Sequence, residues 1–447
     1  VFNTCVRQRR DLDARRREAQ QQRQTAPPSH VQNHMRTKPH SRFGSQPVGA
    51  SHFETHSLRA RVRTTRSKSA IVTRALPLVA VLSACAVTPS EDAGVDAGYT
   101  PTQSRLLGLN DLTALLPLEP LDAGTTFPTA FELLPFASFD RLTSASPRVV
   151  TDLKRLRVLG VRFDICDRAL PGPCPVDADG VFRLVLQPVF GEPPRAEDIT
   201  LHAFYAVPRA DVPGVVDELR ALATLQDVPR SAALQVNTSA AYRDGLGALV
   251  TRYAKAERMH RLTLFGQETD RAANVWIFRG EERAGTTALG PVQIPGINTT
   301  SQEVLLFGGD SYTLTPVADA PAGFSRAVMD LNFRYASAAE QLESVRSLLA
   351  VDNPNLHTAN TVQCASCHVA TTLLTPRAID AGVDVTALPE RFTSATFDLT
   401  PLGDPGTRFR TLRALGYFNS APLVSQRVVN ETAHALEELE ARYPAAP

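Results

Sequence analysis

Two cysteines and a histidine stand together at Cys364, Cys367 and His368, in the order Cys-Ala-Ser-Cys-His. A thiol can form a disulfide, bind a metal ion as the thiolate, or add as a nucleophile to an activated carbon atom. An imidazole binds transition metals through one of its ring nitrogens. On a helix the two thiols would lie about one turn apart, with the imidazole next to the second. The spacing therefore predicts a compact site with two sulfur atoms and one nitrogen donor.

This Cys-x-x-Cys-His pattern resembles the attachment motif of c-type cytochromes. The resemblance implies that Cys364 and Cys367 form thioethers with the two vinyl groups of a single covalently bound haem c. It also implies that His368 is the proximal ligand of the iron. Cytochrome domains commonly supply a distal methionine after the motif, and no methionine follows His368. Ordinary coordination by histidine and methionine is therefore not expected.

The distal position of the iron has several candidates in the sequence. His357, seven residues before Cys364, is the preferred one, because a loop after a helix can fold over the far face of the ring. Its alternative role is that of a surface loop histidine. Met329 is expected in the core, Met259 at the end of a helix, and His434 on the solvated side of its helix. A five-coordinate iron is the remaining alternative.

The cysteine pair has three other interpretations. A redox disulfide of the thioredoxin kind needs a strand-then-helix setting that the sequence does not show. Half of a zinc site would need a second Cys-x-x-Cys or a histidine pair, and His357 alone is a poor substitute. A structural disulfide between Cys364 and Cys367 is the third. Haem attachment is preferred because the five-residue pattern is specific.

An apolar stretch, Ala75–Ala84, follows a basic segment and ends at Cys85. A stretch of about ten residues fits the apolar part of a signal peptide and is too short to cross a bilayer. Its end, Leu82-Ser83-Ala84-Cys85, resembles the lipobox of bacterial lipoproteins. The resemblance implies cleavage before Cys85, lipid on its sulfur and a membrane anchor, and Ala86 after it implies the outer membrane. The alternative is a cysteine that follows an apolar segment by chance.

The segment before this signal has a different composition from the rest of the chain. Residues 1–74 hold 16 lysines and arginines against 4 acidic residues, whereas the remainder holds 31 against 42. Such an asymmetry indicates two unlike pieces. We expect residues 1–71 to precede the natural start, with Val72 as a candidate start and residues 72–84 as the signal peptide. The alternative is a genuine basic, disordered extension.

The mature chain is expected to begin with a tether and to be acidic. Residues 85–105 are rich in small and acidic residues, which predicts a flexible spacer. The acidic balance argues against nucleic-acid binding, because no basic face remains to meet phosphate. The expected partners are the membrane, through lipid on Cys85, and a redox partner protein.

The pattern of apolar residues predicts an α+β fold, with 43 % of residues apolar, enough for a core. A mixed α/β domain is expected over residues 106–335 and a mainly helical, cytochrome c-like region over 336–447. Strands are predicted at 161–165 and 327–335, where apolar residues alternate, and at 181–190, 201–207, 262–266, 274–279 and 303–308. Helices are predicted after Asp211 and at 240–256, 338–350 and 424–442.

A second cysteine pair and the apolar residues around the motif also lead to structural predictions. Cys166 and Cys174 flank a Pro-Gly-Pro turn, and in an exported protein this spacing predicts a local disulfide, with a metal-ligand pair as the alternative. Apolar residues around the motif are candidates for a dry haem pocket or for an ordinary core: Leu373, Leu374, Phe392, Phe397, Tyr417 and Phe418.

These features predict an exported, lipid-anchored haem protein that faces the periplasm or the cell surface. It would carry single electrons, or sense or bind a small ligand at the iron. Haem-based enzymology such as peroxidase chemistry is a further alternative, which would need a placed distal acid or base. Metalloprotease, P-loop and serine-hydrolase patterns are missing from the sequence. The alternative is a non-catalytic envelope lipoprotein that binds other proteins, with the Cys-x-x-Cys pair as a structural disulfide.

Overall fold

The computed structural model describes residues 105–119, 127–144, 153–166, 174–175, 177–226, 228–230, 233–267, 275–283, 288–294, 299–307, 311–315, 323–399, 412 and 414–446. All of them belong to one unit, Ala84–Pro447. The expected leader 1–71, signal peptide 72–84 and lipidated Cys85 lie outside the described residues. Of the expected tether 85–105, only Arg105 is described.

An antiparallel sheet built from ten of the described strands forms the centre of this unit. Its strands run in the order β1-β2-β3-β5-β6-β7-β9-β10, with β4 beside β3 and β8 beside β7. Their bounds are β1 Thr113–Leu115, β2 Leu156–Ile165, β3 Ala178–Phe190, β4 Arg195–Ala196, β5 Ile199–Pro208, β6 Met259–Gln267, β7 Val275–Arg283, β8 Leu289–Pro291, β9 Ser301–Phe307 and β10 Ser311–Thr315.

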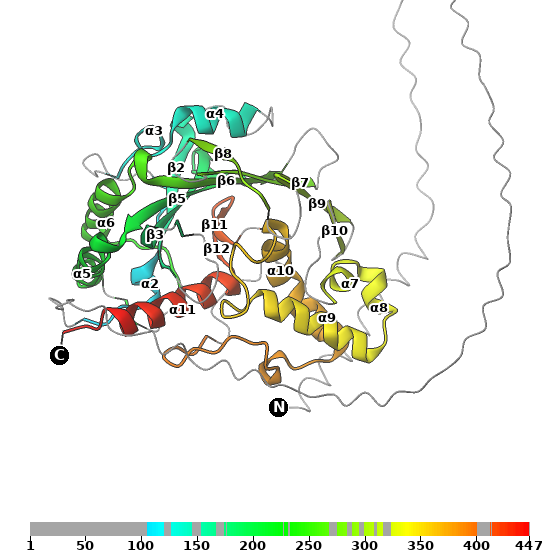
Figure 1. Cartoon of the computed structure of the whole chain (residues 1–447). Helices are drawn as coiled ribbons and strands as arrows, with labels where there is room; N and C mark the ends of the chain where they lie inside the picture. Colours follow the sequence, from blue (N-terminus) through cyan, green and yellow to red (C-terminus); the bar gives the residue numbers. More distant parts are fainter. Residues whose placement is uncertain are drawn as a thin grey trace, which may run out of the picture. The chain divides into compact units, whose positions relative to one another are not determined.

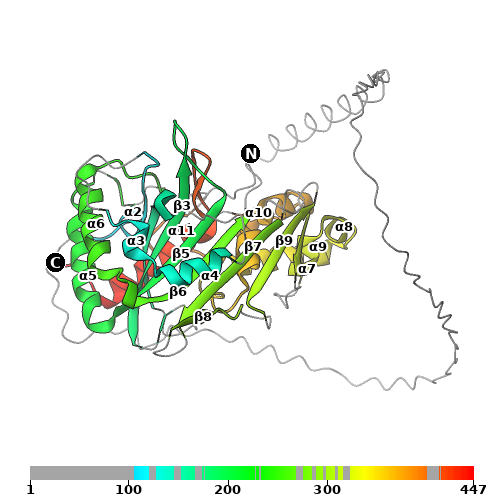
Figure 2. The ribbon, with the colours of Figure 1, turned by 90° about the horizontal axis from the view of Figure 1, so that it is seen from above.

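Helices cover both faces of the sheet (Figures 1 and 2). On one face lie α3 and α4, with α5 and α6 at one end of the sheet, while α10 and α11 lie on the other face. The helices are α2 Leu109–Leu112, α3 Ala130–Leu133, α4 Phe136–Ser144, α5 Val212–Ala223, α6 Ala240–Tyr253, α7 Phe324–Val328, α8 Asp330–Arg334, α9 Ala338–Val351, α10 Cys364–Ala381 and α11 Gln426–Arg442. In the part of the chain that the structure describes, no helix combines the length and apolar character needed to cross a membrane.

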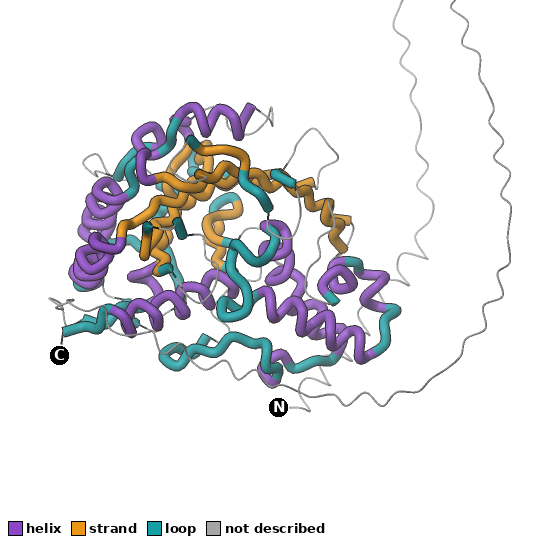
Figure 3. Tube along the Cα trace, in the orientation of Figure 1, coloured by secondary structure: helices purple, strands orange, loops and turns teal. Residues whose placement is uncertain are grey.

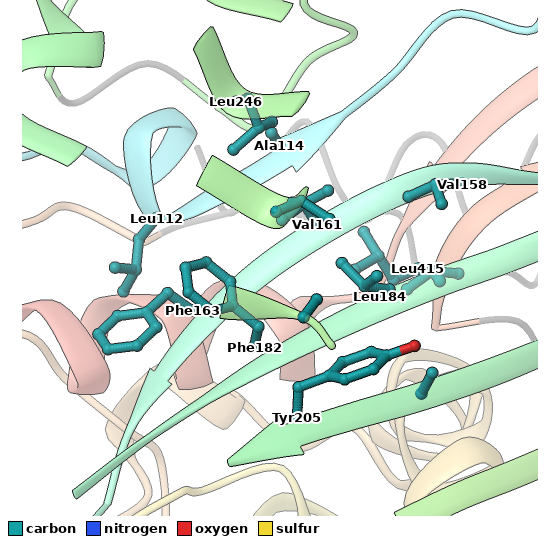
Figure 4. Packing of buried hydrophobic residues seen from close by; sticks show 14 of the residues in the cluster. Leu112, Ala114, Val158, Val161, Phe163, Phe182, Leu184, Tyr205, Leu246 and Leu415 are labelled. Atoms are coloured by element: carbon teal, nitrogen blue, oxygen red, sulfur yellow. The ribbon is translucent and has the colours of Figure 1, made fainter. Parts of the chain in front are cut away.

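The alternation of side chains along the strands separates two environments. On β5, Leu201, Ala203 and Tyr205 belong to the main core, whereas His202 and Phe204 face the side that α10 and α11 cover. Figure 4 shows the main core, where strand side chains meet residues of α2 and α6. The sheet is therefore buried on both sides, but only one side is uniformly apolar.

The C-terminal region packs into the same core as the preceding strands. Val428 and Leu436 of α11 belong to one buried cluster with Phe163 of β2 and Leu112 of α2. The region 336–447 also contains a hairpin, β11 Leu415–Phe418 and β12 Ala421–Val424, so it is helical only in part (Figure 3). The unit is a mixed α+β fold in which residues on both sides of position 335 form one interior.

Most elements that the sequence predicts are present, including α9 with its capping box between Ser337 and Glu340. The strand predicted at 327–335 is wrong, because the chain there forms the short helices α7 and α8. Only part of the alternating face that suggested a strand is buried: Phe333 is fully buried, whereas Leu331 is 64 % exposed and Tyr335 86 % exposed. The backbone N–H of Phe333 donates to the carbonyl of Met329 at 3.0 Å, the bond of a helical turn.

Candidate cofactor-attachment site

The motif forms the first turn of α10. Cys364 is the first residue of the helix, and Cys367 and His368 follow one turn later. Both cysteines are free thiols, and both are half-buried. Helical geometry therefore brings two thiols and an imidazole together at the N-terminal end of α10.

The first turn of α10 is fixed by a glutamine from the sheet. Gln302 of β9 is fully buried, and its side-chain oxygen accepts a hydrogen bond from the backbone N–H of Ala365 at 3.1 Å. Its amide nitrogen donates to the side-chain oxygen of Gln363 at 3.3 Å, and Ser366 donates to the same oxygen at 3.0 Å. A helix start has unsatisfied N–H groups, and here the sheet supplies an acceptor for one of them.

The other end of α10 is anchored through a buried arginine. Arg377 is fully buried, and it donates to the carbonyl of Ala327 at 2.8 Å and to Asp330 at 2.9 Å. Its guanidinium carbon lies over the ring of Phe333, 4.9 Å from the ring centroid. The helix ends at Gly382, whose left-handed backbone conformation favours glycine. Both ends of the helix that carries the motif are thus held.

The imidazole of His368 has a defined orientation. Its Nδ1 lies 2.5 Å from the carbonyl oxygen of Leu412, which can only accept a hydrogen bond, so Nδ1 carries the proton. The neutral ring then has its lone pair on Nε2, the nitrogen that metal-binding histidines commonly use when Nδ1–H donates to a carbonyl. The ring stacks on Phe265 with centroids 4.9 Å apart and tilts against Phe278 at 5.0 Å.

The motif opens on a pocket between the sheet and the helices α10 and α11. The pocket has a volume of about 960 Å³, which includes the solvent at its mouth. Strands β3, β5, β6 and β7 form its floor, and the motif, α11 and the residues before β11 form its walls. Its described lining is Arg183, His202, Phe204, Arg261, Thr263, Leu264, Phe265, Phe278, Arg279, Ala359, Val362, Cys364, Cys367, His368, Ala414, Leu415, Arg427, Val428 and Glu431.

The two thiols stay protonated at neutral pH. Burial raises the pKa of the Cys364 thiol, although Arg261 opposes this. Burial also raises the pKa of the Cys367 thiol to about 12, against the opposing effect of Arg427. Thiols that work in disulfide exchange have a lowered pKa, because the thiolate is the attacking species. This environment does not match a thioredoxin-like role.

Arginines give the pocket unused hydrogen-bonding capacity. Arg183 and Arg261 line it, and the Nε atom of each is buried without a hydrogen-bond partner. Arg261 also pairs with Glu282 at 2.6 Å, which leaves part of its guanidinium for another acceptor. A buried unpaired N–H is costly, and guanidinium groups pair well with carboxylates. The pocket is therefore suited to a ligand that is largely apolar but carries carboxylates.

An ion-pair network on α11 forms one wall of the pocket. Glu431 accepts from Arg427 at 2.6 Å and from Arg162 at 2.6 Å, and lies 3.7 Å from Arg183. Asp164 pairs with Arg162 at 2.5 Å and with Arg183 at 3.1 Å. Burial alone would raise the pKa of Glu431, but the three guanidinium groups hold it well below its usual range. This carboxylate is therefore charged at neutral pH.

The same network separates the pocket from a second cavity, where His357 lies. That cavity has a volume of about 550 Å³, including open solvent, and shares Arg183, Ala359, Arg427 and Glu431 with the first. The ring of His357 is 3.4 Å from the Thr361 hydroxyl, and burial together with Arg427 lowers its pKa. The structure therefore brings Cys364, Cys367 and His368 together and places His357 in a neighbouring cavity.

The other expected ligands also lie away from the motif pocket. His434, expected on a solvated surface, is half-buried, lines the second cavity and meets Phe392 edge-on at 6.2 Å. Met259 is fully buried in the main core, and Met329 lies between α7 and α8. Neither methionine belongs to the described lining of either cavity.

Sequence reasoning found the motif but missed the walls of its pocket. The six apolar residues near the motif that were candidates for a dry pocket do not belong to its described lining. Leu373 and Leu374 belong to α10 and pack in the cluster with Val304 of β9 and Leu348 of α9, Phe392 and Phe397 belong to the main core, and Tyr417 packs against β2 and β4. The aromatic walls are Phe204, Phe265 and Phe278 from the sheet. The sequence places these phenylalanines on strands. It does not show which helices cover the face of the sheet on which they lie.

The predicted pair Cys166 and Cys174 forms a disulfide. Cys166 packs with Val181 and Phe204, so the disulfide lies against the same strands that floor the motif pocket. Among the described residues, no group of three or more His, Cys, Asp or Glu side chains is arranged to hold a metal ion.

Comparison with known proteins gives no relative. No protein-family model, no curated protein and no solved structure matches this chain. The proposals below therefore depend on the residues and on the geometry of the site.

Proposed function

We propose that this chain is a lipid-anchored c-type haem protein of the cell envelope, which transfers single electrons or binds a small ligand at one haem. The observation that carries this proposal is the first turn of α10. There, two free thiols and a histidine with a fixed tautomer open together on one pocket. Two thiols one turn apart, followed at once by an imidazole, match the attachment chemistry of haem c.

The donor set and the pocket both support this group. Cys364 and Cys367 would hold haem through thioethers, and His368 would be the proximal ligand of its iron. The unpaired Nε atoms of Arg183 and Arg261 suit the two propionate carboxylates of haem. When bound, the haem would supply one-electron chemistry or a coordination position for a small ligand.

The protein's own side chains would do three things in this function. The carbonyl of Leu412 keeps the proton on Nδ1 of His368, so Nε2 carries the lone pair through which the ring would bind a metal ion. The rings of Phe265 and Phe278, both nearly fully buried, exclude water from one side of the imidazole. The Arg427–Glu431 pair keeps a fixed charge arrangement in the pocket wall. A dry, rigid surrounding lowers the reorganisation that electron transfer requires.

The cellular location in this proposal comes from the sequence around Cys85. Its apolar stretch and the Leu-Ser-Ala-Cys ending support export, lipid attachment and an outer-membrane position. Metabolic labelling with a palmitate analogue tests this part. We expect label on the wild-type protein and none on Cys85→Ser, and a labelled Cys85→Ser protein would contradict the lipid site.

Haem attachment is tested by producing the full chain in a bacterial host with the cytochrome c maturation machinery. We expect a mass increase of one haem, a pyridine haemochrome of the two-thioether type and haem staining on a denaturing gel. All three should disappear in the double variant Cys364→Ser and Cys367→Ser. The double variant Cys166→Ser and Cys174→Ser is the matched control, because it removes the same number of sulfur atoms and should keep its haem.

Absence of haem from the wild-type protein, in a host that matures a known cytochrome, would overturn the proposal. A disulfide between Cys364 and Cys367 in that protein would instead favour the envelope lipoprotein without a cofactor.

A further inference from the structure

We propose that His202 of β5 is the second axial ligand of the iron, in place of the sequence-based candidate His357. This inference rests on the proposed function, because it requires haem at Cys364 and Cys367. Of the described residues that line the motif pocket, two are histidines: His368 and His202. The pocket therefore offers an imidazole from the helix and another from the sheet.

The strand register places His202 near the phenylalanine on which the ring of His368 stacks. His202 of β5 is paired with Thr263 of β6, and Phe265, two residues further along β6, lies diagonally from His202. Diagonal neighbours in an antiparallel pair are about 7–8 Å apart. Since the ring of His368 stacks on Phe265 at 4.9 Å, both imidazoles lie at the same part of the sheet face.

The setting of His202 limits how its ring can move. It is half-buried, and its ring lies 6.4 Å from that of Phe204 at a tilt of 45°. A strand of a central sheet, paired on both sides with β3 and β6, provides a rigid base for a ligand. The same sheet also holds the ring of His368, which comes from α10, through the stack on Phe265 of β6.

The competing candidates do not share this pocket. His357 lines the second cavity, on the other side of the Arg427–Glu431 pair. Met259 packs in the main core with the side chains on the opposite face of the sheet. His202 is thus the candidate that the fold brings to the same pocket as the proximal ligand.

The test is the spin state of the haem-loaded full chain, read by optical and electron paramagnetic resonance spectra. We expect a low-spin wild-type protein with two imidazole ligands, and a high-spin His202→Ala variant. Added free imidazole should restore the low-spin spectrum of His202→Ala, because it fills the position that the side chain left. The matched control is His357→Ala, which should keep the wild-type spectrum.

Several results would overturn this inference. A high-spin wild-type protein, or a His202→Ala variant that stays low-spin without added imidazole, would show that His202 is not a ligand. A change to high spin in His357→Ala alone would assign the position to His357. The haemochrome and the mass of the same samples keep the two proposals apart, because covalent haem with the wrong spin state refutes only this inference. A wild-type protein without haem refutes both. Circular dichroism of His202→Ala reports whether that variant is folded.

Discussion

The imidazole of His368 lies on the ring of Phe265, with centroids 4.9 Å apart and an angle of 29° between the planes. This stack joins the functional turn of α10 to a central strand, although the two residues are about a hundred positions apart in the sequence. Because the carbonyl of Leu412 holds the other side of the imidazole, the ring has little freedom to turn. The sheet is therefore part of the site and not only a support for it.

Replacement of Phe265 should therefore change the site as well as the stability. Phe265→Ala deletes a buried ring, which we expect to lower the free energy of unfolding by roughly 3–5 kcal/mol. Phe265→Leu keeps most of the apolar volume and should cost less than about 1.5 kcal/mol. In Phe265→Leu the haem spectrum should still broaden, because His368 loses its stacking partner. Urea unfolding and low-temperature electron paramagnetic resonance measure the two effects.

A matched control for Phe265→Leu is available on the other face of the sheet. Phe163 is fully buried and contacts Phe182 with centroids 5.1 Å apart, far from the motif pocket. Phe163→Leu should reduce stability to a similar degree and leave the haem spectrum unchanged. Equal spectra for Phe265→Leu and the wild-type protein would contradict a role for the stack.

The sequence predicted the sheet and the motif for different physical reasons. Strands β2, β3, β5, β6, β7 and β9 were found because their apolar residues form local patterns, such as the alternation in β2, that burial of a strand requires. The motif was found because its chemistry needs residues that are adjacent in the chain. The false strand at 327–335 shows the limit of alternation, since Leu331 and Tyr335 turned out to be exposed residues of helix α8 and its end.

The pocket could not be predicted, because its walls come from distant parts of the chain. Along β6, Arg261, Thr263 and Phe265 alternate with the core residues Leu262 and Leu264. A partly polar strand face normally indicates solvent, and nothing within the strand shows that α10 and α11 cover it. The partly buried position of Glu431 was missed for the same reason, because its three arginine partners lie on β2, β3 and α11.

Loss of the charge on Glu431 should destabilise the protein strongly. Glu431→Gln leaves the guanidinium groups of Arg162, Arg183 and Arg427 without their shared partner, and removal of one side of a buried pair costs roughly 3–5 kcal/mol. The control is Glu343→Gln on α9. Glu343 is exposed and forms a surface ion pair with Arg326 at 3.0 Å, so that change should cost less than about 1 kcal/mol.

The same carboxylate should contribute to acid unfolding. Its pKa in the folded protein lies well below the value in the unfolded chain, so its contribution is present above the unfolded value and is lost as the pH falls through the folded value. Urea unfolding from pH 7 down to pH 3 should therefore show a steeper loss of stability for the wild-type protein than for Glu431→Gln. Parallel curves would contradict this role.

Asp352 should give the opposite dependence on pH. Burial raises the pKa of this carboxyl to about 6, although the hydroxyl of Thr371, 2.5 Å away, and Arg427 favour its charged form. Between pH 4 and 6 the folded protein then binds more protons than the unfolded chain, so stability falls as the pH rises through this window. The slope contributed by one such group approaches 1.4 kcal/mol per pH unit. Urea titrations should show that Asp352→Asn removes this slope.

Asp384, an exposed aspartate whose pKa is shifted in the opposite direction, provides a control. The hydrogen bonds from Thr386 hold the pKa of Asp384 below its usual range, so its contribution to stability appears as the pH rises through the acid region. Asp384→Asn should therefore leave the slope between pH 4 and 6 unchanged. A slope that survives in Asp352→Asn would show that another group titrates in this window.

The disulfide between Cys166 and Cys174 should stabilise the floor of the motif pocket by restricting the unfolded chain. It closes a short loop, with a sequence separation of 8, for which the chain-entropy relation gives about 2.5 kcal/mol. A reductant should lower the free energy of unfolding of the wild-type protein by this amount. It should have no effect on the double variant Cys166→Ser and Cys174→Ser, which has the lower stability from the start. Thiol counting must show that reduction is complete. Because thioether bonds resist reductants, the covalent haem should stay attached throughout, so a loss of haem on reduction would contradict thioether attachment at Cys364 and Cys367.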